Sequence, residues 1–199
     1  MYLLLILLFY AYLLFIFKRK NLYSFSLIFG SVGFFLISLV FFRDFFVTNM
    51  IKGTTFTMNH LGKITNTWLG YVDYGVVFVD NGAETVSLNI DYECSGFIEC
   101  LVYVSLCLFF PLYKLKDKIK YSVLGIIYIE IANIIRLLFI CLCISFYGNK
   151  AFYFAHSVIG RLIFFGLTLF LYFNVFTRAQ IKNQKVGNFE YTKEKEENK

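Results

Sequence analysis

Long runs of apolar residues constrain this chain more than any other feature. Five such runs cover residues 3–17, 22–42, 97–112, 121–146 and 152–176. About 18 or more apolar residues in succession indicate a membrane span, because about 20 helical residues cross the roughly 30 Å of hydrocarbon in a bilayer. Hydrophobic residues make up 59% of the chain, above the roughly 45–50% of a soluble domain. The sequence therefore predicts a single all-α polytopic membrane bundle over residues 1–199, with about five transmembrane helices.

Lysine and arginine are distributed unequally between the two ends of these runs. Most of them lie in residues 18–20, 114–120 and 178–199, which alternate with segments that carry only isolated cations. Cytoplasmic loops are enriched in Lys and Arg, so we expect the N-terminus and residues 43–96 outside and the C-terminus in the cytoplasm. The polar tail from residue 178 has a composition typical of disorder. The net charge of +6 is then mainly a topology signal, and it does not favour nucleic-acid binding.

The extracytoplasmic segment 43–96 contains a predicted β-hairpin at residues 75–90. Two β-branched runs flank Asp80-Asn81-Gly82, and Asn-Gly is a strong signal for a two-residue hairpin turn. A hairpin alone is marginally stable in water, so we expect it to pack on the membrane bundle. Upstream, Trp68 and Tyr71 are suited to lying at the level of the lipid headgroups.

The first polar feature is the segment 91–96, directly before the third apolar run. Cys94 lies here at a predicted helix start, whereas the other four cysteines lie within apolar runs, where a thiol acts as a small hydrophobe. Free N–H groups and the helix dipole stabilise a thiolate at such a position. The N–H groups of Ser95 and Gly96 could also hold an oxyanion. The alternative is structural: Ser95 caps the helix, Gly96 permits the turn and Cys94 is incidental.

Polar side chains interrupt the fourth run at Glu130, Asn133 and Arg136. A charge within a span costs about 2.5–3.5 kcal/mol on insertion scales, so it usually faces the bundle interior beside a partner. Asn133 and Arg136 are three residues apart and share a helix face, and the predicted topology puts Arg136 in the outer half of its span. There the guanidinium could hold a carboxylate or carbonyl oxygen, or stabilise a thiolate. A structural ion pair with Glu130 is the alternative.

His156 lies near the outer end of the fifth run, four residues before Gly160. An imidazole can take a proton from a thiol near neutral pH, although a lone interfacial histidine is often only a satisfied polar residue. The predicted topology places Cys94, Arg136 and His156 on the same side of the membrane. These residues belong to three different spans, so we expect a combined site at the outer face.

In three motifs, this sequence resembles the exosortase/archaeosortase family of membrane cysteine transpeptidases. The motifs are Glu93-Cys94-Ser95-Gly96, Asn133-x-x-Arg136 and His156-x-x-x-Gly160-x-x-x-Phe164. Their order and their positions relative to the spans also match, and the likeness covers about residues 71–176. The short chain is similar to the compact Gram-positive branch. The resemblance implies that Cys94 is the nucleophile, with Arg136 and His156 as catalytic partners and Glu93, Ser95, Gly96, Asn133 and Gly160 in support.

The resemblance also implies the substrate, which would be another membrane protein. Its C-terminal signal would contain a short motif, a transmembrane helix and a basic cluster. Cleavage near the motif would give a thioester on Cys94, and the acyl group would pass to a lipid or glycan acceptor. This chemistry needs no metal or organic cofactor.

Two other functions are open from the residues alone. The chain could be a non-enzymatic scaffold or transporter subunit for envelope-polymer assembly, in which Glu130, Asn133 and Arg136 stabilise the bundle or line a polar pathway. A membrane thiol oxidoreductase is less favoured because the five cysteines include no C-x-x-C pair.

Overall fold

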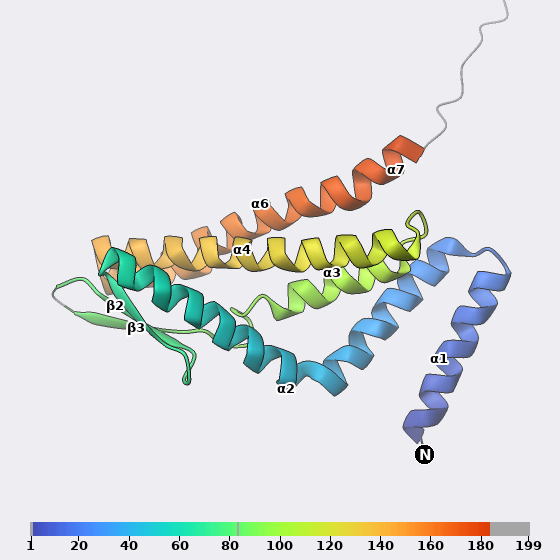
Figure 1. Ribbon diagram of the computed structural model, residues 1–199, viewed down its shortest axis with the longest axis horizontal. Helices are drawn as coiled ribbons and strands as arrows, with labels where there is room; N and C mark the ends of the chain where they lie inside the picture. Colours follow the sequence, from blue (N-terminus) through green and yellow to red (C-terminus); the bar gives the residue numbers. More distant parts are fainter. Residues whose placement is uncertain (1, 83, 184–199) are drawn as a thin grey trace, which may run out of the picture.

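The computed structural model describes residues 2–82 and 84–183, which form a helical bundle with a small sheet at one end (Figure 1). The helices are α1 (Tyr2–Arg19), α2 (Tyr23–Thr65), α3 (Phe97–Phe109), α4 (Leu115–Tyr147), α5 (Asn149–Phe154), α6 (Gly160–Tyr172) and α7 (Arg178–Asn183). Two single turns of π-helix, η1 (Ala155–Ile159) and η2 (Phe173–Thr177), join α5 to α6 and α6 to α7. The strands are β1 (Trp68–Tyr71), β2 (Val76–Asp80) and β3 (Thr85–Asn89).

Three helical stretches in the described part of the chain are long and apolar enough to cross a membrane. They are Tyr23–Thr65, Leu115–Tyr147 and Asn149–Lys182, and α3 is a shorter apolar helix beside them. The prediction of a polytopic helical membrane protein is therefore confirmed at this level. The spans at residues 97–112 and 121–146 correspond to α3 and α4, and residues 152–176 lie within the continuous helix from α5 to α7.

Helix α2 differs from the prediction because it continues through Arg43 and Asp44 to Thr65. At about 1.5 Å per residue its 43 residues extend about 65 Å, so it is much longer than one membrane crossing. The helix bends near its middle (Figure 1), where Thr48 Oγ1 donates to Asp44 O (2.7 Å) and Asn49 Nδ2 donates to Phe45 O (2.6 Å). Side chains that bond to the preceding turn bend helices. The polar residues thus mark a bend and not a helix end, and the first part of segment 43–96 is helical.

The predicted hairpin is present as β2 and β3, and β1 extends it to an antiparallel sheet in the order β1-β2-β3. Val77 pairs with Leu88 and Val79 with Val86, and these side chains are buried. They pack against Leu137, Ile140 and Ile144 of α4 in the same core cluster. The sheet therefore packs on the helical bundle, as the marginal stability of an isolated hairpin requires.

Trp68 is buried, and this differs from the expected position at the lipid headgroups. Its side chain is 3% exposed, and its Nε1 donates to Met58 O of α2 at 2.9 Å. Gly62 permits this contact, because a Cβ there would lie 2.2 Å from the Trp68 carbonyl oxygen. Tyr71, in contrast, is exposed. The tryptophan therefore fixes the sheet to the C-terminal half of α2.

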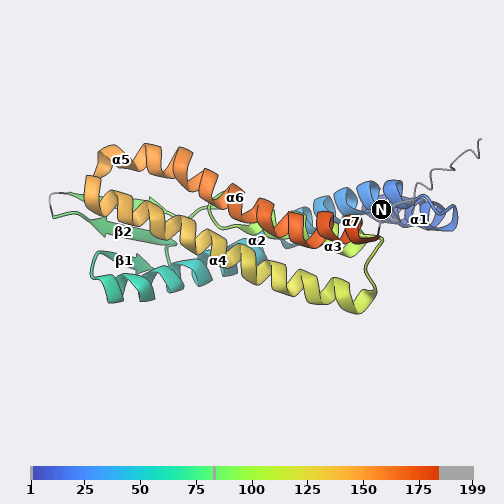
Figure 2. The ribbon, with the colours of Figure 1, turned by 90° about the horizontal axis from the view of Figure 1, so that it is seen from above.

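Helix α4 is central to the arrangement. In the half of the molecule that holds the sheet, it lies between α2 and the helices α5 and α6 (Figure 2). At the opposite end of the long axis lie the α1–α2 turn, the α3–α4 connection and α7 (Figure 1). Residues 178–183 of the predicted tail are helical, and residues 184–199 lie outside the described part.

Candidate active site

The turn between β3 and α3 presents Cys94 to the bundle interior. The Asp91 carboxylate oxygen Oδ1 accepts the backbone N–H groups of Glu93 (3.1 Å) and Cys94 (3.0 Å). Ser95 Oγ donates to Tyr92 O (3.0 Å) and accepts the N–H of Phe97 (3.4 Å). Short polar side chains that bond to nearby backbone in this way favour turns and helix starts. The turn thus holds the Cys94 side chain, which is 4% exposed.

Gly96 starts α3 with a φ of +75°, a left-handed conformation that glycine adopts without a steric penalty. Ser95 and Gly96 therefore have the roles that the structural alternative predicts: Ser95 accepts an N–H at the helix start, and Gly96 permits the turn. They do not make Cys94 incidental, because the same turn leaves the N–H groups of Ser95 and Gly96 without a hydrogen-bond acceptor among the described residues. Such free N–H groups can stabilise a developing negative charge.

Helix α4 supplies Asn133 and Arg136 to this turn. Asn133 is fully buried, and its Nδ2 donates to the Cys94 carbonyl oxygen at 2.9 Å. Arg136 is 5% exposed, and its Nη2 lies 3.5 Å from Cys94 Sγ. Its guanidinium also lies over the Phe164 ring, 5.6 Å from the centroid. Asn133 and Arg136 thus share a helix face that is directed at Cys94. Asn133 contacts the Cys94 backbone, and Arg136 contacts the Cys94 sulfur.

Glu130 does not form the alternative ion pair with Arg136. Its Oε2 accepts a hydrogen bond from Thr54 Oγ1 of α2 at 3.4 Å. Within residues 2–82 and 84–183, Arg136 Nε has no hydrogen-bond partner. The buried guanidinium therefore has a free donor beside the thiol.

His156 completes the cluster from the π-helical turn η1. Its Nε2 lies 3.2 Å from Cys94 Sγ, and its ring stacks on Phe152 at a centroid distance of 5.6 Å. Single π turns within helices frequently occur at functional sites. Gly160 lets this segment approach α4, because a Cβ there would lie 2.9 Å from Ala155 O and 3.0 Å from Ile140 Cδ1. The structure therefore brings together Cys94, Arg136 and His156. Arg136 lies 42 positions after Cys94 in the sequence, and His156 lies 62 positions after it.

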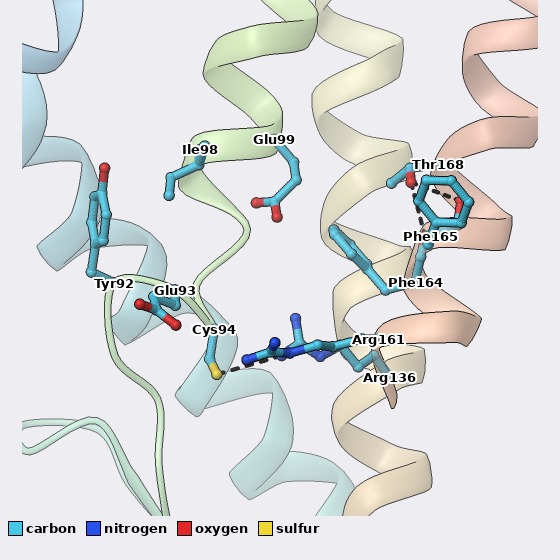
Figure 3. A pocket seen from close by; sticks show the side chains of 10 residues that line it. All are labelled: Tyr92, Glu93, Cys94, Ile98, Glu99, Arg136, Arg161, Phe164, Phe165 and Thr168. Atoms are coloured by element: carbon cyan, nitrogen blue, oxygen red, sulfur yellow. Dashed lines mark hydrogen bonds between the residues drawn. The ribbon is translucent and has the colours of Figure 1, made fainter. Parts of the chain in front are cut away.

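A cavity of about 470 Å³ opens beside the thiol, between the start of α3 and α6. Cys94, Glu93 and Glu99 line one side, and Arg136 and Phe164 line the other (Figure 3). Arg161 also borders the cavity and is exposed. The cavity has the size of a small-ligand pocket, and it gives another molecule access to the sulfur.

The surroundings of Cys94 favour the neutral thiol over the thiolate, although a helix start by itself favours the thiolate. Burial raises the pKa of Cys94 to about 11. The Arg136 cation lowers this pKa, but the Asp91 and Glu93 carboxylates raise it. A nearby base is therefore needed to remove the proton, and the His156 ring nitrogen is within hydrogen-bond distance of the sulfur.

Asp91 and Phe164 contribute to this site, although the sequence predicted no function for either residue. Asp91 stands three residues before Cys94, a spacing at which an Asp side chain can bond the backbone of a following turn. Phe164 is four residues after Gly160 and eight after His156, so it lies on the same helix face. Both spacings can be seen in the sequence, but neither predicts that Asp91 contacts Cys94 or that Phe164 contacts Arg136.

The sequence profile of the transmembrane exosortase family (Exosortase_EpsH) matches residues 1–173. The chain belongs to this family. No curated protein and no solved structure matches it. Membership supports a membrane transpeptidase at the level of the family, and Cys94, Arg136 and His156 all lie within the matched residues.

Proposed function

We propose that this exosortase-family protein is a membrane-embedded cysteine protease or transpeptidase that cleaves the C-terminal sorting signal of membrane-anchored proteins. The observation that carries the proposal is the convergence of His156 Nε2 and Arg136 Nη2 on Cys94 Sγ, at 3.2 and 3.5 Å, beside a cavity. A nucleophile within reach of a base and a cation is the arrangement that covalent catalysis needs.

The reaction begins with proton transfer from the Cys94 thiol to His156 Nε2. The thiolate then attacks the scissile carbonyl carbon, forming a C–S bond and a tetrahedral oxyanion. Among the described residues, three donors near Cys94 have no acceptor and can stabilise that oxygen: the N–H groups of Ser95 and Gly96, and Arg136 Nε. The C–N bond breaks, the amine leaves with the proton from His156, and a thioester forms on Cys94. A water molecule, or a lipid or glycan hydroxyl or amine, then attacks the thioester and restores the thiol.

The orientation proposed for this chemistry places the site at the outer face, in a bundle of about five spans with a cytoplasmic C-terminus. Its support is that the basic segments near residues 18–20, 114–120 and 178–182 lie at one end of the long axis (Figure 1). The sheet and the Cys94 turn lie toward the other end. Segregated Lys and Arg residues set the orientation of membrane proteins.

The test compares membrane proteins from cells that contain the wild type, Cys94→Ala or Cys94→Ser. Single-span proteins with a C-terminal helix and basic tail should be shortened only with the wild type, and a hydroxylamine-sensitive adduct should be detected on Cys94 by mass spectrometry. Cys143→Ala serves as the control, because Cys143 lies outside the three motifs and does not line the cavity beside Cys94. Normal shortening with a stably inserted Cys94→Ala variant would falsify the proposal and favour the scaffold function.

A further inference from the structure

The strand that leads to Cys94 has an open edge. β3 (Thr85–Asn89) pairs with β2 on one side only, because the sheet order is β1-β2-β3. Ile90 N–H donates to Gly75 O (2.8 Å) and Asn81 N–H donates to Glu84 O (3.3 Å). In an antiparallel ladder, alternate residues direct their backbone groups to the partner strand. The groups of Val86 and Leu88 therefore face β2, and those of Thr85, Ser87 and Asn89 face away from it.

The outward groups of β3 have no protein partner in the described part of the chain. No hydrogen bond from another element reaches Thr85, Ser87 or Asn89, and all three residues are exposed. Natural edge strands are normally protected by lysine, proline, a bulge or a covering element. The sequence Thr85-Val-Ser-Leu-Asn89 contains no charged residue and no proline.

The opposite edge of the sheet is protected in the usual way. Helix α2 packs along β1, and Asn59 Oδ1 of this helix accepts the N–H of Gly70 at 3.3 Å. Trp68 of β1 is buried against Met58 of the same helix. The fold thus covers one edge and leaves open the edge whose strand continues to Cys94, five residues after Asn89.

We propose that β3 binds the substrate polypeptide by strand addition, with the extended segment before the scissile bond pairing along Thr85, Ser87 and Asn89. An exposed row of backbone N–H and C=O groups recognises another extended backbone. The inference rests on the proposed function, since it concerns how that site receives a polypeptide. Side-chain identity matters little along such an edge, and specificity is left to the cavity beside Cys94.

The chain direction of the bound segment relative to β3 follows from the proposed orientation of enzyme and substrate in the membrane. β3 starts at the hairpin tip, which lies beside the α4–α5 turn because a Cβ on Gly148 would be 2.7 Å from Asn81 Nδ2. It then runs toward α3 and the bundle (Figure 1). A substrate with an outer N-terminal part and a C-terminal membrane helix runs the same way. The added strand is therefore parallel to β3, and about five residues span its length at about 3.3 Å each.

The test uses Ser87→Pro with Ser87→Ala as its matched control. Proline removes the outward N–H and places its ring on the open edge, and it leaves the bonds to β2 intact because Ser87 does not face β2. The probes are the single-span proteins that the wild type shortens and Cys94→Ala does not. We expect Ser87→Pro to slow their shortening about tenfold, equivalent to one or two lost hydrogen bonds. Ser87→Ala keeps the backbone N–H that pairs with the substrate, so it should shorten the probes several times faster than Ser87→Pro does.

A second readout separates this inference from the proposed function. Iodoacetamide should alkylate Cys94 equally fast in the wild type and both Ser87 variants, because the Cys94 turn is unchanged. If Ser87→Pro shortens the probes at the wild-type rate, strand addition is wrong and the proposed function is unaffected. Shortening that persists in Cys94→Ala overturns the proposed function, and strand addition with it.

If Ser87→Pro alters the folding of the protein or the alkylation of Cys94, disulfide cross-linking tests strand addition without that variant. Thr85→Cys and Asn89→Cys are each combined with Cys94→Ala and with cysteines placed along the probe before its cut site. Parallel pairing predicts that Asn89→Cys reacts with a probe position nearer the cut than Thr85→Cys does. The reverse order, a cross-link only between two copies of β3, or no cross-link to the probe overturns the proposal.

Discussion

At the scale of single residues, the electrostatics of Cys94 give the first prediction. Arg136→Gln removes the cation that opposes burial, Asp91 and Glu93, so the pKa of Cys94 should rise above about 11. An adjacent opposite charge shifts a pKa by about one unit or more. Below the pKa the thiolate fraction, and hence the alkylation rate, should therefore fall about tenfold. The measurement is the rate of Cys94 alkylation from pH 7 to pH 10 in Cys143→Ala membranes.

Arg161→Gln is the matched control for this experiment. Arg161 borders the same cavity but is exposed, and it is not among the charges that shift the Cys94 pKa. Its substitution should leave the alkylation profile close to that of the wild type. Equal rates for Arg136→Gln and the wild type would contradict the 3.5 Å contact between Arg136 and the sulfur as an electrostatic interaction.

The convergence of the predicted residues on Cys94 could be anticipated from the sequence, but the balance of charges around the thiol could not. Cys94, Arg136 and His156 stand out because polar residues are rare in apolar runs and because the loop charges predict that all three lie on one side. The effect of Asp91 on Cys94 depends on a turn in which its carboxylate faces the Cys94 N–H at 3.0 Å. Burial of the sulfur likewise depends on contacts with Arg136 of α4 and His156 of η1. Neither quantity follows from residue type or spacing.

At the scale of elements, close packing of α3 on α4 gives the next prediction. A Cβ on Gly125 of α4 would lie 1.9 Å from Cε1 of Tyr103, a fully buried side chain of α3 whose hydroxyl donates to Tyr121 O. The ring has no free space, so Gly125→Ala should overpack the interface and destabilise the protein by about 1–3 kcal/mol. A lower midpoint of thermal unfolding in detergent would report the loss.

Gly166→Ala on α6 provides the comparison, because no atom lies within 4 Å of a Cβ at that position. Alanine has a higher helix propensity than glycine, so this variant should be as stable as the wild type or slightly more stable. If both alanine variants unfold at the same temperature, the α3–α4 contact at Tyr103 is looser than in the structure.

Local patterns predicted the elements where local chemistry decides them, as in the hairpin, whose connection between Asp80 and Thr85 contains Asn81 and Gly82. They failed where a tertiary contact decides. β1 has four residues, too few for a clear period-2 pattern, and it is a strand because α2 and β2 flank it. Arg43 and Asp44 indicated a helix end, yet the Arg43 guanidinium lies 4.6 Å from the Tyr92 ring centroid. Tyr92 belongs to the Cys94 turn, so the sequence of α2 alone does not predict this contact.

At the scale of the whole molecule, the two ends of α4 test the proposed orientation. Lys116 lies near its start among basic residues, and Glu84 lies at the hairpin tip, near its other end; both are exposed. The 33 residues of α4 span about 50 Å, enough to place the two positions on opposite sides of a bilayer. In Cys94→Ala, Cys143→Ala cells, a membrane-impermeant maleimide should label Glu84→Cys directly. It should label Lys116→Cys only after permeabilisation.

Tyr74→Cys and Lys20→Cys repeat the comparison at independent positions. Tyr74 is 80% exposed beside the sheet, and Lys20 directly follows α1 in the basic group. Tyr74→Cys should behave as Glu84→Cys does, and Lys20→Cys as Lys116→Cys does. The reverse pattern would place the Cys94 cavity on the cytoplasmic side. A polypeptide that enters from outside could not then reach the open edge of β3, so this labelling pattern bears on the site, its substrate and its mode of binding together.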